Sequence, residues 1–197
     1  MLPITLMFLL CYARRKIHLL EFEMSIVKCV VMGVCGSGKT TVGKALAERF
    51  GATFIDGDDL HPRANIIKMR DGVPLDDKDR APWLERVSDV FFSLANRHAS
   101  GVVVCSALKR KYRDIIRKGN PGLVFIHLYA DKQVILDRMA ARKGHYMKSS
   151  MVDSQFATLE FPDPKEEPDV VSIDVAAPCG EVIDTAIRAL EEREQHE

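Results

Sequence analysis

The sequence predicts a three-layer α/β/α fold around a five-stranded parallel sheet. From Ser25 onward, short apolar runs alternate with amphipathic stretches, the order typical of strands and helices that take turns along a chain. The apolar runs are valine-rich and lack polar alternation, which favours strands buried on both faces. With 197 residues and 47% hydrophobic content, the chain is long enough for one substantial core.

Each element has its own signal. The run 26–32 ends at Gly33 and predicts the first strand; apolar residues at three- and four-residue steps predict a helix over 39–50, which Gly51 ends. A proline suits a first helical turn, so a second helix is expected to begin near Pro62. The further predicted strands are 53–55, 102–105, 123–128 and 170–175, and the further helices are about 82–97, 109–117, 131–142, 151–159 and 181–193.

Charge and cysteine content narrow the class of protein. Lys plus Arg equals Asp plus Glu at 28 each, so no overall charge attracts nucleic acid or an anionic membrane, and neither is an expected partner. The five cysteines show no C-x-x-C pair, which argues against a disulfide framework or a structural zinc site. A reducing, intracellular setting fits best, and the cytoplasm is the expected location.

Residues 1–23 differ from the rest of the chain. Leu2 to Tyr12 is mostly apolar but too short for a bilayer, which needs about 20 residues. The positive charges at 14–16 follow the apolar stretch, whereas a secretory signal places them before it. We expect an extension outside the fold, followed by a single domain over 24–197. Targeting to an organelle is the alternative, because no acidic residue precedes Glu21.

The strongest motif is G-x-x-x-x-G-K-T, which runs from Gly33 to Thr40. It follows a predicted strand and opens a predicted helix, the context of a phosphate-binding loop. The glycines let backbone N–H groups surround phosphates, while Lys39 reaches the β- and γ-phosphates. The Thr40 hydroxyl is placed to bind Mg²⁺. The motif therefore predicts an ATP site and leaves the reaction open.

The acidic residues separate this chain from switch GTPases and motor ATPases. Those proteins usually hold Mg²⁺ with an Asp at the end of a later strand, but 102–105 continues into Ser106 without an acid. Asp56 and Asp58, separated by Gly57, follow the second predicted strand instead. One carboxylate can help hold hydrated Mg²⁺ while the other accepts a proton from an attacking hydroxyl. An Asp-rich turn that caps the next helix is the alternative interpretation.

A basic and polar cluster follows that turn. His61 is expected at the N-cap of the helix that begins at Pro62, with Asn65 one turn further on. Together with Arg63, these side chains suit a substrate that carries hydroxyls and a negative charge. For Lys68, a solvated helix face is the preferred interpretation.

Six successive segments make the chain resemble the thermoresistant gluconokinase family: GVCGSGKTT, DGDDLHPRANIIKM, DDKDRAPWL, VVCSALKRKYRD, ARKGHYMKSSM and SQFATLE. The HPRANIIKM and CSALKRKYRD segments distinguish this family from other enzymes far better than the phosphate loop, which many enzymes share. The resemblance implies transfer of the ATP γ-phosphate to D-gluconate, which feeds the pentose phosphate pathway. It also implies a nucleoside-monophosphate-kinase-like fold with a lid at about 142–152, and a homodimer as the common assembly. Phe161 departs from the family pattern, where a proline or an acid is expected.

The resemblance also implies roles for single residues. Lys39, Asp58 as the base and Arg142 in the lid are the expected catalytic residues, and Thr40 and Asp56 are the expected Mg²⁺ ligands. The residues expected to bind ATP are Gly33, Val34, Cys35, Gly36, Ser37, Gly38, Lys39, Thr40, Thr41 and Arg138. The residues expected to bind gluconate are Asp58, His61, Arg63, Lys109, Arg113 and Gln155.

Two other functions stay open at this point. A shikimate-kinase-like enzyme would keep the fold and phosphorylate another small hydroxy acid, but the HPR segment argues against it. A nucleotide-binding regulator without turnover would lack an acid or a basic residue of the active site, yet Lys39, Thr40, Asp58 and Arg142 are all present.

Overall fold

The sheet has the predicted five parallel strands. A computed structural model describes residues 26–141 and 149–194 of the chain. The strands are β1 (Lys28–Met32), β2 (Thr53–Asp56), β3 (Gly101–Val104), β4 (Leu123–Tyr129) and β5 (Val170–Asp174). They pair in the order β2-β3-β1-β4-β5, and every pair is parallel. All carboxyl ends of the strands therefore meet at one edge of the sheet, where ligands bind in such folds.

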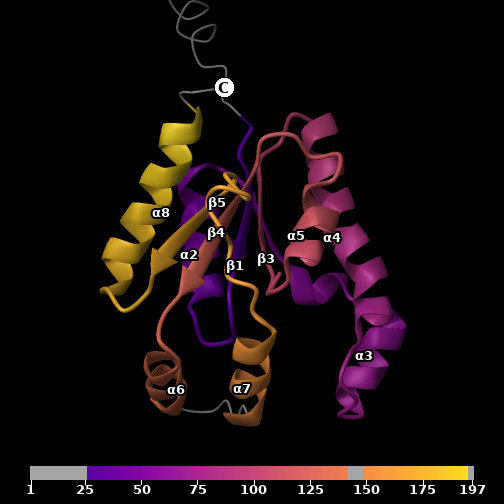
Figure 1. The fold of residues 1–197 in the computed structure, drawn as a ribbon. Helices are drawn as coiled ribbons and strands as arrows, with labels where there is room; N and C mark the ends of the chain where they lie inside the picture. Colours follow the sequence, from indigo (N-terminus) through magenta and orange to yellow (C-terminus); the bar gives the residue numbers. More distant parts are fainter. Residues whose placement is uncertain (1–25, 142–148, 195–197) are drawn as a thin grey trace, which may run out of the picture.

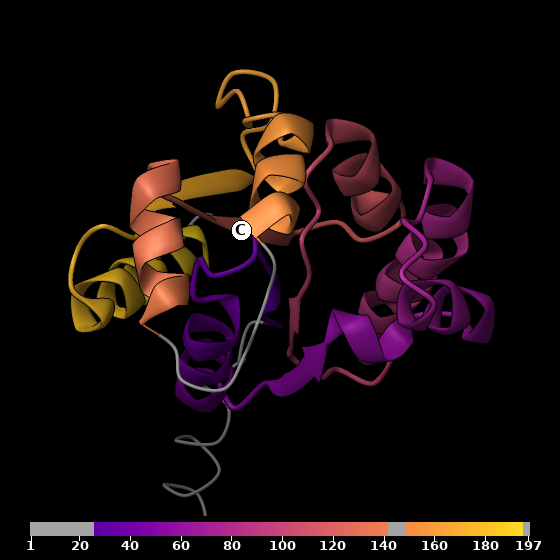
Figure 2. The same ribbon diagram turned by 90° about the horizontal axis from the view of Figure 1, so that it is seen from below.

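Helices cover both faces, which confirms the three-layer prediction. Helix α2 (Lys39–Arg49) and helix α8 (Cys179–Glu194) lie on one face, while α4 (Asp77–Asn96) and α5 (Arg110–Arg117) lie on the other (Figure 1). Helices α3 (Arg63–Arg70), α6 (Lys132–Ala140) and α7 (Ser149–Thr158) lie at the end of the molecule where the strands terminate (Figure 1), and the view from below shows α3 apart from α6 and α7 (Figure 2). A short 3₁₀ turn, η1 (Gly57–Leu60), joins β2 to α3.

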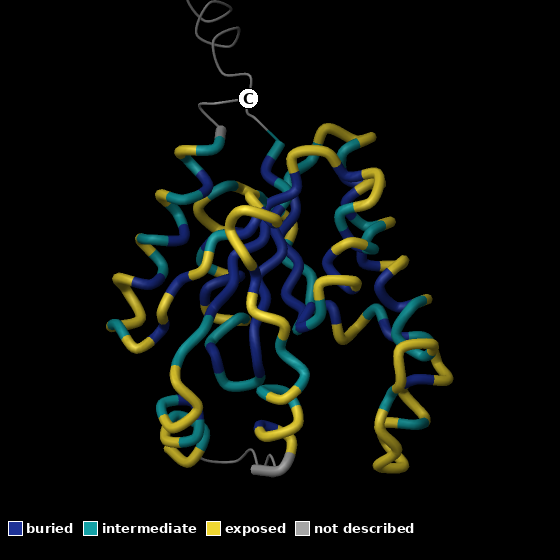
Figure 3. Tube along the Cα trace, in the orientation of Figure 1, coloured by how far each residue is buried: buried dark blue, intermediate teal, exposed yellow. Residues whose placement is uncertain are grey.

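The core forms two layers because successive side chains of a strand point to opposite faces. On β1, Val31 packs with Leu46 of α2 on one face, while Val30 packs with Phe91 of α4 on the other. Every strand residue of β3 is buried, as are the first six residues of β4 (Figure 3). The strands are thus buried on both faces, as their unbroken apolar runs predict.

Helix α4 begins earlier than the prediction of about 82–97. The Asp76 side chain accepts from the backbone N–H of Asp79, and the Asp79 side chain accepts from that of Asp76, which forms a capping box. Pro82 therefore lies inside the helix. Helix α3 also differs in its first residues, because Pro62 and not His61 is its N-cap.

Within the described residues, no helix combines the length and the apolar character that a membrane crossing requires. The predicted extension over 1–23 lies outside the described residues.

Candidate active site

The phosphate loop adopts a conformation that only glycine accommodates at several positions. Gly33, Gly36 and Gly38 have φ angles of 136°, 80° and 95°. A Cβ atom on Gly33 would lie 2.3 Å from the carbonyl oxygen of Leu128. The backbone N–H of Gly33 donates to Ser106 after β3 (3.3 Å), so the loop is anchored to the neighbouring strands.

Two features of this loop lack hydrogen-bond partners within the described residues. Gly38 is the N-cap of α2 and has no side chain to cap the first N–H groups of the helix. The Ser37 hydroxyl is buried and has no hydrogen-bond partner in the described part of the chain. Since helix N-termini and inward N–H groups favour anions, this cradle fits a chain of phosphates.

Lys39 folds back across the loop. Its Nζ donates to the carbonyl oxygens of Gly33 (3.0 Å) and Val34 (2.9 Å). Burial lowers the pKa of Lys39, and the nearby carboxyl groups of Asp58 and Asp56 are among the groups that raise it. The ammonium is therefore held at the mouth of the loop, within the field of the acidic turn.

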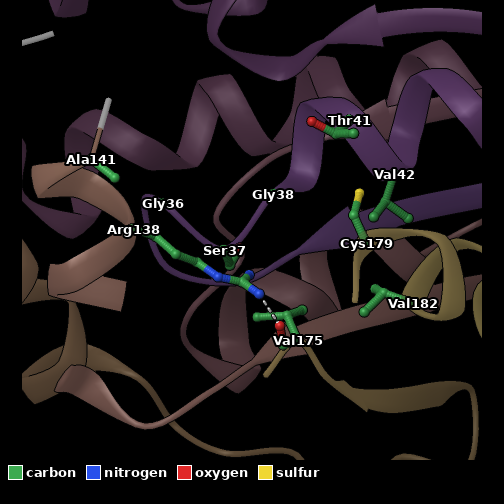
Figure 4. A pocket seen from close by; sticks show the side chains of 10 residues that line it. All are labelled: Gly36, Ser37, Gly38, Thr41, Val42, Arg138, Ala141, Val175, Cys179 and Val182. Atoms are coloured by element: carbon green, nitrogen blue, oxygen red, sulfur yellow. Dashed lines mark hydrogen bonds between the residues drawn. The ribbon is translucent and has the colours of Figure 1, made fainter. Parts of the chain in front are cut away.

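A cavity of about 270 Å³ opens beside the phosphate loop (Figure 4). Gly36, Ser37 and Gly38 form one side, and apolar residues of α2, the β5–α8 connection and α8 form the other. Arg138 of α6 points into it and donates to the carbonyl oxygen of Val175, as the dashed line shows (Figure 4). Arg138 and Thr41 thus lie where the sequence places them, next to the loop.

The acidic turn lies at the carboxyl end of β2, opposite the end of β3. A Cβ atom on Gly57 would come within 2.6 Å of the Val104 carbonyl oxygen, so the residue between the two acids must be small. The Asp56 side chain accepts from the backbone N–H of Asp58 (3.1 Å) and caps η1. The alternative interpretation, a turn that caps the next helix, does not hold for α3, because its N-cap Pro62 receives no side-chain hydrogen bond; Asp56 caps η1 instead, and Asp58 is exposed.

Asp58 lies close enough to Lys39 and His61 for both to act on its pKa. Its pKa is raised, first by partial removal of water and then by the charge of Asp56. His61 and Lys39 act in the opposite direction. Lys39 belongs to the phosphate loop, and His61 belongs to the segment before α3. The phosphate loop and the α3 segment therefore both act on the Asp58 carboxylate.

His61 is the buried residue on the α3 side of the site. Its ring is 7% exposed and stacks on Trp83 of α4, with centroids 4.3 Å apart. Trp83 in turn donates from Nε1 to the Gly57 carbonyl oxygen (2.6 Å), which ties α4 to the acidic turn. The sequence suggests only core packing for Trp83, and its position after Pro82 carries no signal of this contact. Arg63 is exposed on the first turn of α3.

Arg113 requires a correction. The sequence analysis expects it to bind the substrate, but its guanidinium is fully buried and makes a two-pronged ion pair with Glu167 (2.6 and 2.7 Å). Its Nη1 also donates to the carbonyl oxygens of Ala107 and Leu108. With its donors occupied inside the core, Arg113 supports the β3–α5 loop and does not face a ligand.

Gln155 and Lys109 also make contacts that the sequence does not suggest. The side-chain oxygen of Gln155, on α7, accepts from the backbone N–H of Cys35 (2.6 Å), so the expected hydroxyl contact is instead a contact to the phosphate loop. Lys109, the N-cap residue of α5, donates to Asp77 at 3.0 Å. Arg142 and residues 142–148 of the lid predicted at about 142–152 lie outside the described residues, while 149–152 form the start of α7.

The cysteine side chains behave as the sequence suggests. Cys29 and Cys105 are buried among apolar residues, and burial raises the pKa of the Cys105 thiol to about 12. Cys35 in the phosphate loop has a raised pKa because burial outweighs the nearby Lys39 charge. It is therefore a tolerated small residue and not an activated thiol.

Residues with metal-binding atoms are sparse. Over 26–141 and 149–194, no group of three or more His, Cys, Asp or Glu side chains could hold a metal ion. Thr40 is exposed at the start of α2, and Asp56 is half-buried. Both side chains offer oxygen atoms, which suit Mg²⁺ because this ion keeps waters and binds through few protein groups together with phosphates.

The sequence and fold place the chain among known proteins. Residues 29–158 match the family model described as AAA domain. The thermosensitive gluconokinase of Escherichia coli K12 is 51% identical over 74% of this chain and 78% of its own length. The thermoresistant gluconokinase of the same organism is 46% identical over 82% of this chain and 91% of its own length.

Solved structures agree. A gluconokinase from Sinorhizobium meliloti 1021 is 47% identical with a TM-score of 0.74, and the match covers 84% of this chain and 92% of that one. A shikimate kinase from Acinetobacter baumannii covers 88% of this chain and 96% of its own at only 19% identity and a TM-score of 0.52, so it shares the fold alone. Phosphate-loop kinases use ATP as the phosphate donor. From these similarities in sequence and structure, the chain belongs to the gluconokinase family.

Proposed function

We propose that this chain transfers the γ-phosphoryl group of ATP to D-gluconate, which gives 6-phosphogluconate and ADP. The observation that carries the proposal is the position of Asp58 on the turn after β2, at the same edge of the sheet as the phosphate loop, where Lys39 and His61 both act on its carboxylate. A base in that position lies between a phosphate donor and a hydroxyl acceptor. Relatives named gluconokinase, at 46–51% identity, support gluconate as the acceptor.

The donor side would bind ATP through the phosphate loop. The N–H groups at the start of α2 would receive the phosphates, and Lys39 would leave the Gly33 and Val34 carbonyls for the phosphate oxygens. The cavity lined by Val42, Val175 and Val182 would take the apolar part of the nucleotide. Arg138 at its edge would add positive charge.

Mg²⁺ would be held by the Thr40 hydroxyl, with Asp56 reaching its bound water. When bound, it neutralises charge on the β- and γ-phosphates. Mg²⁺ usually keeps several waters and binds through one or two carboxylates together with phosphates, which suits these two side chains.

The chain's own residues would then perform the proton transfer. As a gluconate hydroxyl oxygen bonds to the γ-phosphorus, its proton passes to the Asp58 carboxylate. The bond between the γ-phosphorus and the bridging oxygen breaks, and ADP leaves with that electron pair. Lys39 would stabilise the charge that develops on the phosphoryl oxygens, and Arg142 is proposed to do so from the lid.

On the acceptor side, His61 and Arg63 would contact gluconate. Arg63 is exposed and suits a carboxylate or a hydroxyl. Lys109 would contribute only after it leaves Asp77, with which it is paired here. A homodimer and a cytoplasmic location stay predictions.

A substrate panel tests the proposal. The chain is incubated with Mg-ATP and either gluconate, shikimate or no acceptor, and ADP release is followed. We expect release that depends on gluconate and far exceeds that with shikimate. Tight ATP binding without transfer to any sugar acid would favour the non-catalytic regulator instead.

A further inference from the structure

Asn65 makes two hydrogen bonds that define the orientation of its side chain. It is 2% exposed on α3, and its Nδ2 atom lies 2.8 Å from the backbone carbonyl oxygen of Asp79 on α4. The same Nδ2 atom lies 3.2 Å from Nδ1 of His61. A backbone carbonyl can only accept, so the amide atom beside it must be the nitrogen.

The orientation of Asn65 determines the state of His61. The amide nitrogen has two N–H groups; one points to the Asp79 carbonyl, and the other points to Nδ1 of His61. Nδ1 must therefore be the unprotonated acceptor, and a neutral imidazole with a bare Nδ1 carries its proton on Nε2. We propose that Asn65 is a positioning residue that holds His61 as the Nε2–H tautomer and presents this N–H to the phosphate acceptor.

The surroundings of His61 agree with a neutral, oriented ring. Trp83 of α4 stacks on it with an interplanar angle of 15°, which prevents rotation of the ring out of that plane. Burial lowers the pKa of His61, the charge of Arg80 on α4 lowers it further, and Asp58 on η1 raises it. Nδ1 faces the Asn65 amide and Trp83 covers one face of the ring, whereas no described residue forms a hydrogen bond with Nε2. The Nε2 edge is therefore the part of the ring open to a ligand.

This inference, which rests on the proposed function, gives His61 and Asp58 different roles: His61 binds the acceptor, and Asp58 accepts its proton. An Nε2–H group donates to a gluconate hydroxyl or carboxylate and cannot take a proton from it. The Asp58 carboxylate accepts the proton instead. Asn65 thus acts on substrate binding through His61, without touching the substrate.

Nitrogen-15 NMR of the histidine rings tests the tautomer directly in the full chain. His61→Gln identifies the His61 signals by their disappearance. We expect the parent chain to show a protonated Nε2 and a bare Nδ1 at neutral pH. A parent chain with the proton on Nδ1 would overturn the inference, and this result does not depend on turnover.

The variant Asn65→Asp supplies the second test. A carboxylate accepts from Nδ1–H, so we expect the His61 proton to move to Nδ1 and the KM for gluconate to rise about tenfold. The KM for ATP should stay within about twofold of the parent value, because a hydrogen bond on the acceptor side does not touch the nucleotide.

Lys68→Met is the matched control. It removes another tie between α3 and α4, the 2.6 Å ion pair of Lys68 with Asp79, but leaves the Asn65 amide in place. An equal rise in the gluconate KM for Lys68→Met would show that Asn65 only docks α3, and would refute the proposal. Absence of gluconate turnover in the parent chain would instead refute the proposed function, while the NMR result would still decide the tautomer.

Discussion

At the scale of single residues, Asp58 illustrates how neighbours determine the role of a carboxylate. Asp56 caps the turn through the backbone N–H of Asp58, so one acid organises the position of the other. Asp59, the next residue, is also exposed and acidic, and Asp58 is the carboxylate on which both Lys39 and His61 act. The carboxylates of Asp56, Asp58 and Asp59 therefore differ in their contacts although they lie in one turn.

The variant Asp58→Asn should lose most turnover. Removal of a general base typically lowers kcat by about 10²–10⁴-fold, and ATP binding should stay close to that of the parent chain. Steady-state kinetics and calorimetric ATP titration measure the two quantities. Asp59→Asn is the matched control and should retain nearly full activity. Near-parental turnover of Asp58→Asn would exclude it as the base.

His127 on β4 is a buried titratable residue outside the proposed chemistry. It is 0% exposed, its Nδ1 lies 3.1 Å from the Ser172 hydroxyl, and its buried Nε2 has no partner in the described residues. Burial lowers its pKa to about 4; Arg113 lowers it as well, and Glu167 raises it. Phe161, which departs from the family pattern, packs edge-on against this ring with centroids 4.9 Å apart.

His127 should make the free energy of unfolding fall in acid. Above pH 6.5 the ring is neutral in both the folded and the unfolded chain. As the pH falls from 6.5 to about 4, the unfolded chain binds a proton on this ring, whereas the folded chain does not. The gap between 6.5 and about 4, at about 1.4 kcal/mol per pKa unit, corresponds to about 3 kcal/mol.

Urea unfolding across this pH range measures the effect. His127→Phe, which keeps a planar ring, should lose this part of the pH dependence, whereas the exposed control His98→Gln should retain it. Identical pH dependence in His127→Phe and the parent chain would contradict the assignment.

At the scale of elements, the Arg113–Glu167 pair joins α5 to the segment before β5. Both side chains are nearly fully buried, and Glu167 also accepts from Arg117 (2.9 Å). Ala107, whose carbonyl oxygen accepts from Arg113, has a φ of 42°, which is rare for a residue with a side chain. The pair thus stabilises the strained loop that leads to Lys109.

Glu167→Gln should lower the free energy of unfolding by about 3 kcal/mol, because it leaves a buried guanidinium without its counter-charge. The neighbouring variant Glu166→Gln removes only an exposed partner of Arg110 and should change stability by less than about 1 kcal/mol. Urea unfolding of the two variants compares them directly. Equal losses of unfolding free energy in the two variants would show that burial of the Arg113–Glu167 pair does not determine its contribution to stability.

Patterns within one element were enough to predict the strands and the phosphate loop, since apolar runs and glycine spacing are local properties. Helical spacing predicted that His61 and Asn65 lie in one cluster, but not the hydrogen bond between them, and Pro62 is the N-cap. The partners of Arg113, Gln155 and Trp83 lie 54, 120 and 26 residues away, and local patterns carry no information on such contacts. Arg113 was accordingly expected at the substrate and is found in the core.

At the scale of the whole molecule, the strand order explains how one edge serves two substrates. Strand β1 leads into the phosphate loop, and β2, beyond β3, leads into the acidic turn and α3. The phosphate loop and the α3 segment are therefore separated by one strand position, and Asp58 lies in the field of both. The central claim is that a phosphoryl group crosses this space from ATP to gluconate.

Identification of the product tests this claim most directly. Gluconate is incubated with Mg-ATP and the full chain, and the products are analysed by mass spectrometry and phosphorus NMR, with Lys39→Met as the control. The account predicts gluconate heavier by one phosphoryl group, a phosphorus signal coupled to its C6 protons, and far less product with Lys39→Met. Unchanged gluconate in the presence of chain-bound ATP would contradict it.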